Sequence, residues 1–524
     1  MPNGPHGLLE PRVESIVSWD DGSGAGEALY ATGVFDSAGG VPLTGLGRWH
    51  PSTGWSSFGD AEFSGHVLRV LQLPSDARPM LYLGGAFSAV NGVQARGVAR
   101  FDGANWTALG NGLYADGSGS PDGVQDLAAF DDGTGLKLYA ALNGFLNPIT
   151  GVYVFDGAAW SRAGTPPYPT GGTSTLATYH DGTSNALYAG GYCSGVTRVW
   201  RFDGTSWTSR TGHSTWNLVG TVASLAVYDD GAGPALFVGG FWNWPQIGWL
   251  ERLDATAVTP VALNVAGGVY DLAVDDDLSG STLCVAGGFD SIGGTTSPGA
   301  ARWNGSTWSN LGTGFASQVA PLGVISILPR TDPVTGQREV VAAGRFDVAG
   351  GNGASNLARL VECQRNAFCF GDGALADHTT ACPCGNNGVR GSGCAHSFDA
   401  RGASLVTTGV PSHGDVALHA QSLPATSFTL FIQHTSVGDT IFHDGVLCAG
   451  GTLVRLRGRA AAAGQAQFPN SLFAQDSTTT LAQRGGVFPG QGVRRYYSGW
   501  YRNASSTFCP PATANVTNGC LVDW

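Results

Sequence analysis

A repeat of about fifty residues, with a pair of glycines at its centre, organises the first two-thirds of this chain. Its clearest copy reads Leu81-Tyr82-Leu83-Gly84-Gly85-Ala86-Phe87 and is followed by Arg100-Phe101-Asp102-Gly103 and by Trp106. Other copies begin at Leu29, Leu138, Leu187, Leu236, Leu283 and Val340, at intervals of 47 to 57 residues. A period of this length, with several short strands per copy, is typical of small sheets arranged around an axis.

Each copy of the repeat predicts four short strands joined by tight turns. The first strand is apolar, as in residues 222–228, and ends in Asp229-Asp230-Gly231, a hairpin signal because Asp and Gly tolerate positive φ. The second strand carries the glycine pair, as in residues 236–241. The third ends in an Asp-Gly or Asn-Gly turn, and a tryptophan follows on the fourth. The Asp-Asp-Gly turns could also hold calcium, but their recurrence at one position favours hairpin chemistry.

Two features of the repeat predict close contact between neighbouring sheets. Paired glycines suit a place where backbones approach so closely that a Cβ atom does not fit. The tryptophan, such as Trp106, offers a large apolar body to fill the gap between adjacent sheets. The fifth copy departs from the pattern, because Arg252-Leu253-Asp254-Ala255 leads to Val258 without the glycine or the tryptophan. We therefore expect a looser outer edge there.

This order of a hydrophobic strand, a glycine pair, an aromatic residue and a tryptophan resembles the kelch-type β-propellers, such as the central domain of galactose oxidase. The likeness covers residues 8 to 362 and implies an all-β fold with a seven-bladed β-propeller over residues 1–362. The seventh copy meets Cys363 before any fourth strand, and His6-Gly7-Leu8-Leu9 is similar to the end of one. We predict that residues 1–10 supply the outer strand of the last blade and so close the ring.

Hairpins alternate between the two ends of such a blade, which predicts one uniform face and one variable face. The loops between second and third strands, and between successive copies, vary in length and content. Binding residues on rigid scaffolds usually lie in variable loops. The candidate ligand-binding aromatics there are Trp242, Trp244, Trp216 and Tyr168. They could instead plug the mouth of the ring or pack between blades.

A second candidate site lies on the innermost strands, which line the axis of a propeller. Aligning these strands places one polar residue of each copy in register, namely Ser15, Arg69, Asp126, Thr175, Ser224, Asp271 and Ser326. Arg69 is the only cation in this predicted row, with Asp126 and Asp271 as candidate counter-ions. The row is interpreted either as structural lining or as a binding site for a small anionic or polyol ligand.

Eight of the ten cysteines follow the repeats, and their spacing favours disulfides over zinc. They are Cys363, Cys369, Cys382, Cys384, Cys394, Cys448, Cys509 and Cys520. Zinc modules usually pair two Cys-x2-Cys motifs, whereas this segment has a single Cys-x-Cys. Proximity favours the pairs Cys384–Cys394 and Cys509–Cys520 among the many that eight cysteines allow. The segment is similar to Cys-rich β-domains that end secreted proteins of GC-rich environmental bacteria.

The segment after residue 400 alternates apolar and polar residues, which predicts strands and a small disulfide-rich β-sandwich. Examples are residues 427–433 and 451–457, separated by Gly-Asp and Pro breaks. The predicted domains are therefore the propeller at 1–362, a Cys- and Gly-rich connector at 363–400 and the sandwich at 401–524. Trp500 and Tyr501 are interpreted as core residues in preference to a carbohydrate-binding pair.

Charge and cysteine content restrict where the protein acts and what it contacts. The net charge of −12 argues against nucleic acids and anionic membranes, which require a basic surface. No apolar run reaches the length of about 18 residues that spans a bilayer. The chain start does not read as a signal peptide, but the cysteine density indicates an oxidising compartment. We expect a secreted or cell-surface protein whose signal is missing from this sequence; a cytosolic protein with reduced thiols is the alternative.

Catalytic motifs of other propellers and hydrolases are not evident in the sequence. The 11 histidines form no cluster suited to a copper site, and no Gly-x-Ser-x-Gly, His-Glu-x-x-His or phosphate loop occurs. We therefore favour a non-catalytic extracellular binding or scaffold protein for a glycan or another protein, without cofactor or metal. One alternative is a secreted polysaccharide hydrolase or lyase with its site at the axis. Another is a structural component of a cell envelope or extracellular assembly. The sequence does not indicate an oligomeric state.

Overall fold

The structure is a computed structural model in which the chain forms two compact units built almost entirely of β-strands. It describes residues 5–6, 11–60, 64–113, 123–142, 151–164, 172–193, 197–211, 220–243, 246–254, 257–277, 280–312, 314–317, 323–333, 338–350, 352–362, 367–373, 378–389, 391–408, 414, 416–470, 473, 476, 479–488, 491–503, 505, 508–509 and 513–524. The first unit comprises residues 1–275, 281–334 and 341–359, and the second comprises 276–280, 335–340 and 360–524. Across these described ranges, the one helix has five residues, and no helix is long and apolar enough to cross a membrane.

The first three sheets of the first unit each contain four antiparallel strands in sequence order. The first is formed by β2 (Arg12–Trp19), β3 (Ala28–Val34), β6 (Leu46–His50) and β7 (Gly54–Ser56). The second is formed by β8 (Ser64–Leu71), β9 (Met80–Ala86), β12 (Val98–Phe101) and β13 (Trp106–Ala108). The third is formed by β14 (Val124–Asp131), β15 (Leu136–Leu142), β16 (Gly151–Phe155) and β17 (Trp160–Arg162).

The fourth and fifth repeats join into one eight-stranded sheet, because β19 also pairs with β22. Its strands are β18 (Thr173–His180), β19 (Asn185–Cys193), β20 (Thr197–Phe202), β21 (Trp207–Thr211), β22 (Gly220–Asp229), β23 (Pro234–Asn243), β24 (Gln246–Leu253) and β25 (Val258–Ala266). The sixth repeat forms β26 (Val269–Asp277), β27 (Gly280–Gly287), β30 (Ala300–Trp303) and β31 (Trp308–Asn310). The last sheet contains β33 (Gly323–Thr331), β34 (Arg338–Arg345) and β37 (Leu357–Glu362).

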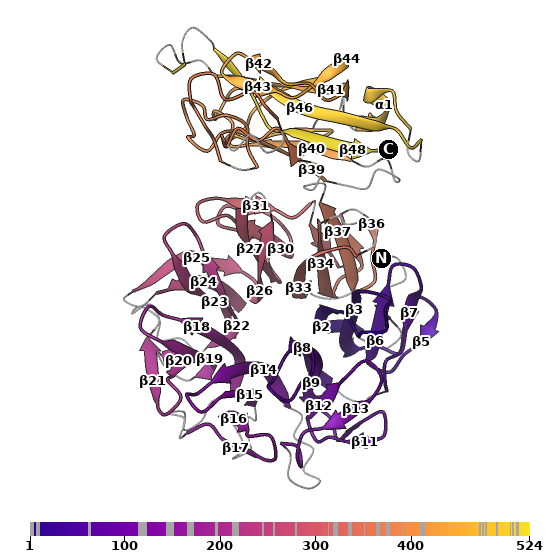
Figure 1. Ribbon diagram of the computed structural model, residues 1–524, viewed down its shortest axis with the longest axis vertical. Coiled ribbons are helices and arrows are strands. Elements are labelled where there is room, and N and C mark those ends of the chain that lie inside the picture. Colours follow the sequence, from indigo (N-terminus) through magenta and orange to yellow (C-terminus); the bar gives the residue numbers. More distant parts are fainter. Residues whose placement is uncertain are drawn as a thin grey trace. The chain divides into compact units, whose positions relative to one another are not determined.

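These sheets follow one another around a common centre, with the first strand of each repeat innermost (Figure 1). We call this propeller-like arrangement the ring. It closes by side-chain packing between the first and last sheets, because Val13 and Val341 belong to one buried cluster. In addition, the guanidinium of Arg330 on β33 donates to the hydroxyl of Ser18 on β2, at 3.1 Å.

The N-terminal segment pairs with a different partner from the one predicted. β1 (Pro5–His6) pairs with β4 (Ser37–Ala38), which lies between the second and third strands of the first repeat. The prediction that this segment forms the outer strand of the last sheet is therefore wrong for residues 5–6. The segment before the last sheet, β32 (Phe315–Ala316), pairs in the same way with β35 (Val348–Ala349). The chain start thus occupies the position of a linker leading into a first strand.

The glycine pairs of the second and fifth repeats stand where neighbouring groups approach closely, as the sequence predicted. A Cβ atom on Gly84 would lie 2.7 Å from Cγ1 of Val124 in the next sheet. A Cβ atom on Gly240, the second glycine of its pair, would collide with the carbonyl oxygen of Thr221 on the adjacent strand. Any side chain would therefore force these strands apart.

Tryptophans on the outer strands of the second, third and fourth repeats join each of them to the preceding repeat. Trp106 is 6% exposed, and its indole N–H donates to the carbonyl oxygen of Phe58 in the preceding repeat, at 2.9 Å. Trp160 makes the equivalent bond to the carbonyl oxygen of Leu109, at 3.0 Å. The expected apolar filling is thus combined with a hydrogen bond that fixes the orientation of the ring.

The Asp-Asp-Gly turns are held by their own carboxylates. Asp20 accepts a hydrogen bond from the N–H of Gly22, and Asp229 accepts one from the N–H of Gly231, each at 2.9 Å. Such local bonds are the ordinary way in which an aspartate stabilises a turn. They support the hairpin interpretation of these sequences.

The second unit contains two sheets of antiparallel strands. One has the order β38 (Ala367–Phe368), β48 (Gly519–Asp523), β46 (Arg494–Arg502), β41 (Phe428–Ser436) and β44 (Gly450–Ala460), with β47 (Ala514–Val516) also paired to β46. The other has the order β39 (Ser404–Thr408), β40 (Ala417–Gln421) and β45 (Ala466–Phe468). A hairpin of β42 (Thr440–Phe442) and β43 (Gly445–Leu447) and the helix α1 (Leu481–Gly485) complete the unit.

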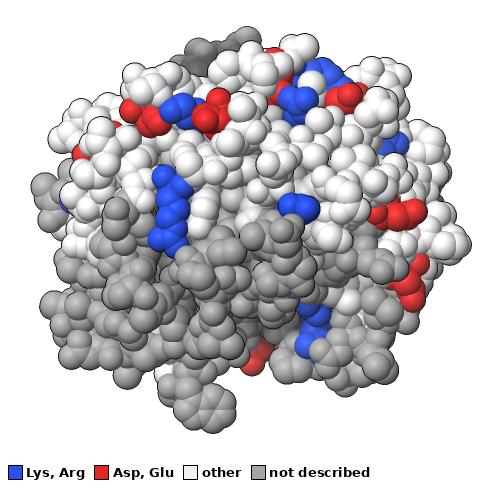
Figure 2. All heavy atoms as spheres, turned by 90° about the horizontal axis from the view of Figure 1, so that it is seen from below, with Lys and Arg blue, Asp and Glu red and all other residues white. Residues whose placement is uncertain are grey.

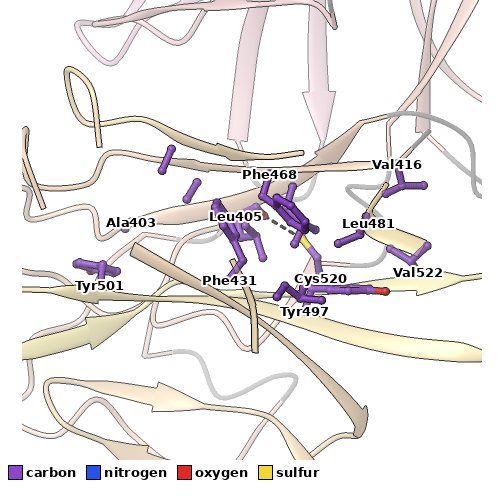
Figure 3. Close-up of a cluster of buried hydrophobic side chains, with 14 of the residues drawn as sticks. Ala403, Leu405, Val416, Phe431, Phe468, Leu481, Tyr497, Tyr501, Cys520 and Val522 are labelled. Atoms are coloured by element: carbon purple, nitrogen blue, oxygen red, sulfur yellow. Dashed lines mark hydrogen bonds between the residues drawn. The ribbon is translucent and has the colours of Figure 1, made fainter. Parts of the chain in front are cut away.

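Both sheets of the second unit contribute to a single core (Figure 3). Leu405 and Phe468 come from the three-stranded sheet, and Phe431, Tyr497 and Tyr501 come from the larger one. All five are 1% exposed or less. The larger sheet, which we call the central sheet, therefore has one face on this core and an opposite, outer face.

Three disulfides crosslink the second unit, as the cysteine spacing predicted. They are Cys369–Cys448, Cys382–Cys394 and Cys384–Cys509. Cys363 lies outside the described residues. The bridges enclose 79, 12 and 125 residues of chain, so two of them tie distant segments together.

The pairing expected from proximity in the sequence is wrong. Cys382, not Cys384, joins Cys394, and Cys509 joins Cys384 rather than Cys520. Cys382 and Cys394 are both buried, whereas Cys384 is exposed. The packing of the connector, rather than the length of the intervening chain, therefore decides which sulfur atoms meet.

Candidate functional site

Trp242, one of the two aromatics expected on the surface of the fifth repeat, is not a surface residue. Trp242 is 3% exposed and packs against Trp249, with ring centroids 6.3 Å apart. The second strand of this repeat extends past its usual end, so the residue enters the core between strands. The prediction that Trp242 is an exposed ligand contact is therefore wrong. Trp244, Trp216 and Tyr168 lie outside the described residues.

The polar row on the innermost strands is present, with one correction. In each sheet with a described register, the row residue follows a bulge and lies opposite the first residue of the glycine pair or its equivalent. In the second sheet Val67 holds this position, opposite Gly84, and Arg69 lies opposite Tyr82. The sequence alignment was shifted there by two residues, because Leu68 and Val70 both fit the apolar position that follows the row residue. The inner row is therefore Ser15, Val67, Asp126, Thr175, Ser224, Asp271 and Ser326.

Side chains of the inner row bind backbone N–H groups of the following sheet. An innermost strand is an edge strand, whose inward N–H groups have no partner within their own sheet. The hydroxyl of Ser15 accepts a bond from the N–H of Leu68, at 3.1 Å. The hydroxyl of Ser224 accepts one from the N–H of Leu272, also at 3.1 Å. The inner row thus forms a belt of hydrogen bonds between consecutive sheets.

Asp126 combines several of these contacts at one carboxylate that is 1% exposed. One oxygen accepts bonds from the N–H of Leu127 and from the guanidinium of Arg69, at 2.8 and 2.7 Å. The other accepts bonds from the N–H of Leu176 and the hydroxyl of Thr175, at 2.8 and 3.3 Å. Asp126 is therefore the counter-ion of Arg69 and also an acceptor for the fourth repeat.

Asp271 has the same role in the sixth repeat. One oxygen accepts bonds from the hydroxyl of Ser224 and the N–H of Leu272, at 3.2 and 2.9 Å. The other accepts the N–H of Ile327 in the last sheet, at 2.9 Å. Burial raises the pKa of Asp271, and these bonds and the charge of Arg69 oppose that rise. Arg69 therefore interacts electrostatically with carboxylates in two separate repeats, Asp126 and Asp271.

The side chain of Arg69 is exposed to solvent near the inner row. Its side chain is 41% exposed, whereas that of its partner Asp126 is 2% exposed. The equivalent positions, two residues after the inner row, are Val17, Ala128, Ala177, Ala226, Ala273 and Leu328. A single exposed guanidinium among apolar side chains can donate hydrogen bonds to the oxygen atoms of a ligand.

The loops between second and third strands fall into two classes. Four repeats carry the same small hairpin after a buried phenylalanine such as Phe35 or Phe87. The hairpins are β4 (Ser37–Ala38) with β5 (Val41–Pro42), β10 (Ala89–Val90) with β11 (Val93–Gln94), β28 (Ser291–Ile292) with β29 (Thr295–Thr296), and β35 (Val348–Ala349) with β36 (Asn352–Gly353). The face that carries these loops is therefore less variable than expected, because the first, second, sixth and seventh repeats share the same hairpin.

The fourth and fifth repeats depart from that common hairpin, and the corresponding residues 143–150 of the third repeat lie outside the described residues. In the fifth, the ladder between β23 and β24 runs on to the pair Asn243 and Gln246, so the strands continue where other repeats fold the small hairpin. In the fourth, β19 extends to pair with β22 of the next repeat. The departures are adjacent in the ring, which confines the variable surface to one arc.

An ion pair inside almost every repeat was missed by the sequence reasoning. An arginine on the third strand pairs with an aspartate at the end of the first strand or in the turn after it. The pairs are Asp21–Arg48, Asp76–Arg100, Asp181–Arg201, Asp230–Arg252, Asp275–Arg302 and Asp332–Arg359. The signal was visible as an arginine or aspartate recurring at fixed positions. Figure 2 shows acidic and basic side chains close together on one face that is mostly uncharged.

The third repeat makes its ion pair from a different element. Val154 stands on the third strand where the other repeats place arginine. Lys137 on the second strand instead contacts Asp132, at 2.8 Å. Hydrogen bonds from Lys137 and Thr134 outweigh the effect of burial and lower the pKa of Asp132 to about 2. The single lysine of the chain therefore compensates for the missing arginine.

Comparison with known proteins gives structural neighbours only. No protein-family model matches the chain, and no curated protein matches it. It is similar to the extracellular domain of the putative one component system BT4673 from B. thetaiotaomicron, with TM-score 0.41 and 10% identity over 80% of this chain and 45% of that one. It is also similar to the extracellular domain of the putative hybrid two component system BT3049 from B. thetaiotaomicron, with TM-score 0.25 and 10% identity over 97% and 85% of the two chains. A third neighbour is the GH74 enzyme of Niastella koreensis, with TM-score 0.23 and 12% identity over 99% of both chains. The chain spans less than half the length of the first of these proteins.

Proposed function

We propose that this chain is an extracellular, non-catalytic binding or scaffold protein that presents its ligand contacts on a rigid ring of sheets. In this proposal, residues 1–362 form a seven-bladed propeller of the kelch type, residues 363–400 a connector, and residues 401–524 a disulfide-held β-sandwich. Seven successive antiparallel groups of strands, beginning with β2, β8, β14, β18, β22, β26 and β33, support the blade count.

The hydrogen bonds accepted by the carboxylates of Asp126 and Asp271 are the main support for the non-catalytic interpretation. A polysaccharide hydrolase or lyase at the axis would need carboxyl groups that are available to exchange protons with substrate. Both oxygens of each aspartate instead accept hydrogen bonds, including backbone N–H groups of a neighbouring repeat. Protonating either group would weaken a joint between sheets. We therefore assign both to holding the ring together.

A glycan or an extracellular protein is the proposed ligand, bound on the arc formed by the fourth and fifth repeats. Four repeats share one hairpin, whereas these two have diverged while keeping their sheets. Divergence confined to adjacent loops on a rigid scaffold is typical of a binding surface. Trp244, Trp216 and Tyr168 remain the proposed aromatic contacts on this arc. Three disulfides in the second unit support a secreted or cell-surface location.

A loop graft tests the proposed surface. Full-length protein is screened on arrays of glycans and extracellular proteins, and residues 243–246 are then replaced by residues 88–95, the common hairpin of the second repeat. We expect the graft to abolish binding to the array ligand while the thermal transition of the ring persists. The matched control replaces residues 88–95 by residues 290–297, which exchanges one common hairpin for another and should leave binding unchanged.

Three outcomes would overturn this assignment. Release of reducing sugar from a bound glycan would show catalysis. Equal loss of binding in the graft and in the control would show that the arc is not special. If the graft binds normally while Arg69→Gln does not, the ligand contacts the exposed guanidinium at the centre of the ring instead.

A further inference from the structure

Two consecutive aromatic residues of β46 lie on opposite faces of the central sheet. Tyr501 is fully buried in the core, opposite Thr429 on β41. Trp500 is half-buried and lies opposite Leu430, on the outer face. The core interpretation of this pair is therefore confirmed for Tyr501, whereas Trp500 is left on a side that requires a different explanation.

An apolar floor extends from Trp500 across the neighbouring strands. Leu430 on β41 lies between Trp500 on β46 and Gly458 on β44. The ring of Phe428 covers Gly458, because a Cβ atom there would collide with the ring. Phe428 is nevertheless 48% exposed. Glycine thus lets an aromatic ring lie flat on the outer face while its other side meets solvent.

Two exposed arginines flank this floor. Arg455 lies opposite Ile432 on the outer face, and Arg502 follows Trp500 by two residues on the same side of β46. On the core side of β44, by contrast, Arg457 and Arg459 both contact Asp476. Strands β41, β44 and β46 contain six arginines and no aspartate or glutamate. Ile432, Ser498 and Val516 on the same face are buried. The basic and aromatic surface is therefore the exposed part of the outer face, with Phe428, Arg455 and Arg502.

The positive charge of this surface contrasts with the rest of the chain. Residues 1–359 contain 17 basic and 30 acidic residues, a balance of −13. Residues 360–524 contain 10 basic and 9 acidic residues, a balance of +1, which together gives the total of −12. A locally basic face attracts an anionic partner. The acidic charge of the rest of the chain directs that partner to this face.

We propose that the outer face of the central sheet binds an acidic polysaccharide built of uronic acid residues. The apolar faces of its sugar rings lie on Phe428 and Trp500, and its carboxylates form charge-assisted hydrogen bonds with Arg455 and Arg502. A polysaccharide fits better than a nucleic acid, because the disulfides indicate an oxidising compartment and the net charge opposes polyphosphate. This proposal is independent of the ligand on the ring.

Affinity electrophoresis of the full chain in gels containing polygalacturonate tests the proposal. The parent should be retarded, and Phe428→Ala and Trp500→Ala should each weaken apparent affinity at least tenfold. Phe428 is exposed, so its variant should fold even if Trp500→Ala does not. The matched control is Phe398→Ala, a 68% exposed phenylalanine of the same unit, which should be retarded like the parent.

Charge reversal provides a second arm of the same test. Arg455→Glu with Arg502→Glu should abolish retardation by polygalacturonate, and added salt should weaken the parent in the same gels. Dextran, which is neutral, should not retard the parent. The proposal is overturned if polygalacturonate leaves the parent unretarded, if Phe398→Ala weakens binding as much as Phe428→Ala, or if dextran retards equally. Tighter binding to a single-stranded DNA oligonucleotide would overturn it in favour of nucleic acid. In every case, array binding by the ring is scored separately.

Discussion

The ring and the second unit solve the same problem, holding small antiparallel sheets together, by different chemistry. Within the ring, each type of contact recurs from repeat to repeat, including the Asp–Arg pair, the tryptophan N–H bond and the inner row. The second unit has no such repetition, and three disulfides connect its distant segments. The ring therefore distributes its stability over many similar joints, whereas the second unit concentrates much of it in a few covalent links.

This difference follows from how each unit buries its apolar surface. In the ring, every sheet has a neighbour on each side, so a large core is shared among repeats. The second unit is smaller and includes a long connector with few strands of its own. A small extracellular domain of this kind commonly depends on crosslinks that limit its unfolded state.

Reduction is expected to have the largest effect and to act on the second unit. Loss of a native disulfide typically costs about 2–5 kcal/mol, so losing three should exceed the stability of a small domain. Scanning calorimetry with and without reductant should show one transition disappear while that of the ring remains. Before reduction, the mass should be about 6 Da below the all-thiol value if only these bridges form. Loss of the ring transition under the same conditions would contradict the comparison.

The next largest effect is expected from Trp106→Ala in the ring. The variant removes a buried aromatic body and its bond to Phe58, and should lower the free energy of unfolding by about 3–5 kcal/mol. Chemical denaturation of the ring transition measures the loss. Phe488→Ala, at a residue 69% exposed in the second unit, is the control and should change stability by less than about 0.5 kcal/mol. Equal losses of unfolding free energy in the two variants would show that Trp106 does not hold neighbouring sheets together.

A smaller loss is expected when an ion pair inside a repeat is broken. Asp76 is 7% exposed and accepts bonds from Arg100 and the hydroxyl of Tyr82, both at 2.6 Å. Asp76→Ala leaves these donors unpaired and should cost about 3 kcal/mol. The side chain of Asp132 is 13% exposed, whereas that of Asp76 is 0% exposed, so Asp132→Ala should cost only about 1 kcal/mol. Similar losses at the two sites would mean that burial does not set the strength of these pairs.

Features of the ring that recur in every repeat were the ones that sequence could predict. The glycine pair and the tryptophan have the same steric consequences in the copies that carry them, so their roles could be inferred before the structure. The Asp–Arg pairs recurred just as regularly, but they were missed because the arginine was considered only as part of a turn motif. A residue that recurs at the same position of successive repeats therefore indicates a structural contact, even where the sequence does not show which residue it contacts.

Features that depend on a single local irregularity were not predictable. Two alternate apolar residues, Leu68 and Val70, concealed that Val67 and not Arg69 lies in the inner row, and an extended strand carried Trp242 into the core. The cysteine pairs followed the packing of the connector, so Cys384 met a partner 125 residues away. None of these events changes the apolar pattern from which strands are predicted. The candidate site was therefore harder to predict than the fold.

Mild acid should distinguish the two units through the histidines of the second. Burial lowers the pKa of His419 to about 4, and it also lowers the pKa of His396 and His434. Their folded pKa values lie below the unfolded value of about 6.5. The stability they contribute is therefore complete above that pH and is lost as pH falls toward 4.

The ring should resist acid to a lower pH, because the groups with lowered pKa values among its described residues are carboxylates. The folded pKa of Asp132, about 2, lies below its unfolded value, so its contribution persists above about pH 4 and is lost as pH falls through 2. Between pH 6.5 and 4, the melting temperature of the second unit should decrease while that of the ring stays nearly constant. Calorimetry across this range measures both transitions. A parallel decrease would show that the histidines do not set the difference.

The smallest effect is expected from a single link of the inner row. Ser15→Ala removes the acceptor for the N–H of Leu68 and should cost about 1 kcal/mol, the usual contribution of one hydrogen bond. Ser224→Ala also removes the donor to Asp271 and should cost somewhat more, and the double variant should show the sum, because the two serines lie in separate repeats. Ser174→Ala, in the bulge beside the inner row, is the matched control and should have little effect. Denaturation of the ring transition measures all four variants. A double variant that loses far more than the sum would show that the belt acts as one cooperative element, and that the ring concentrates its stability as the second unit does.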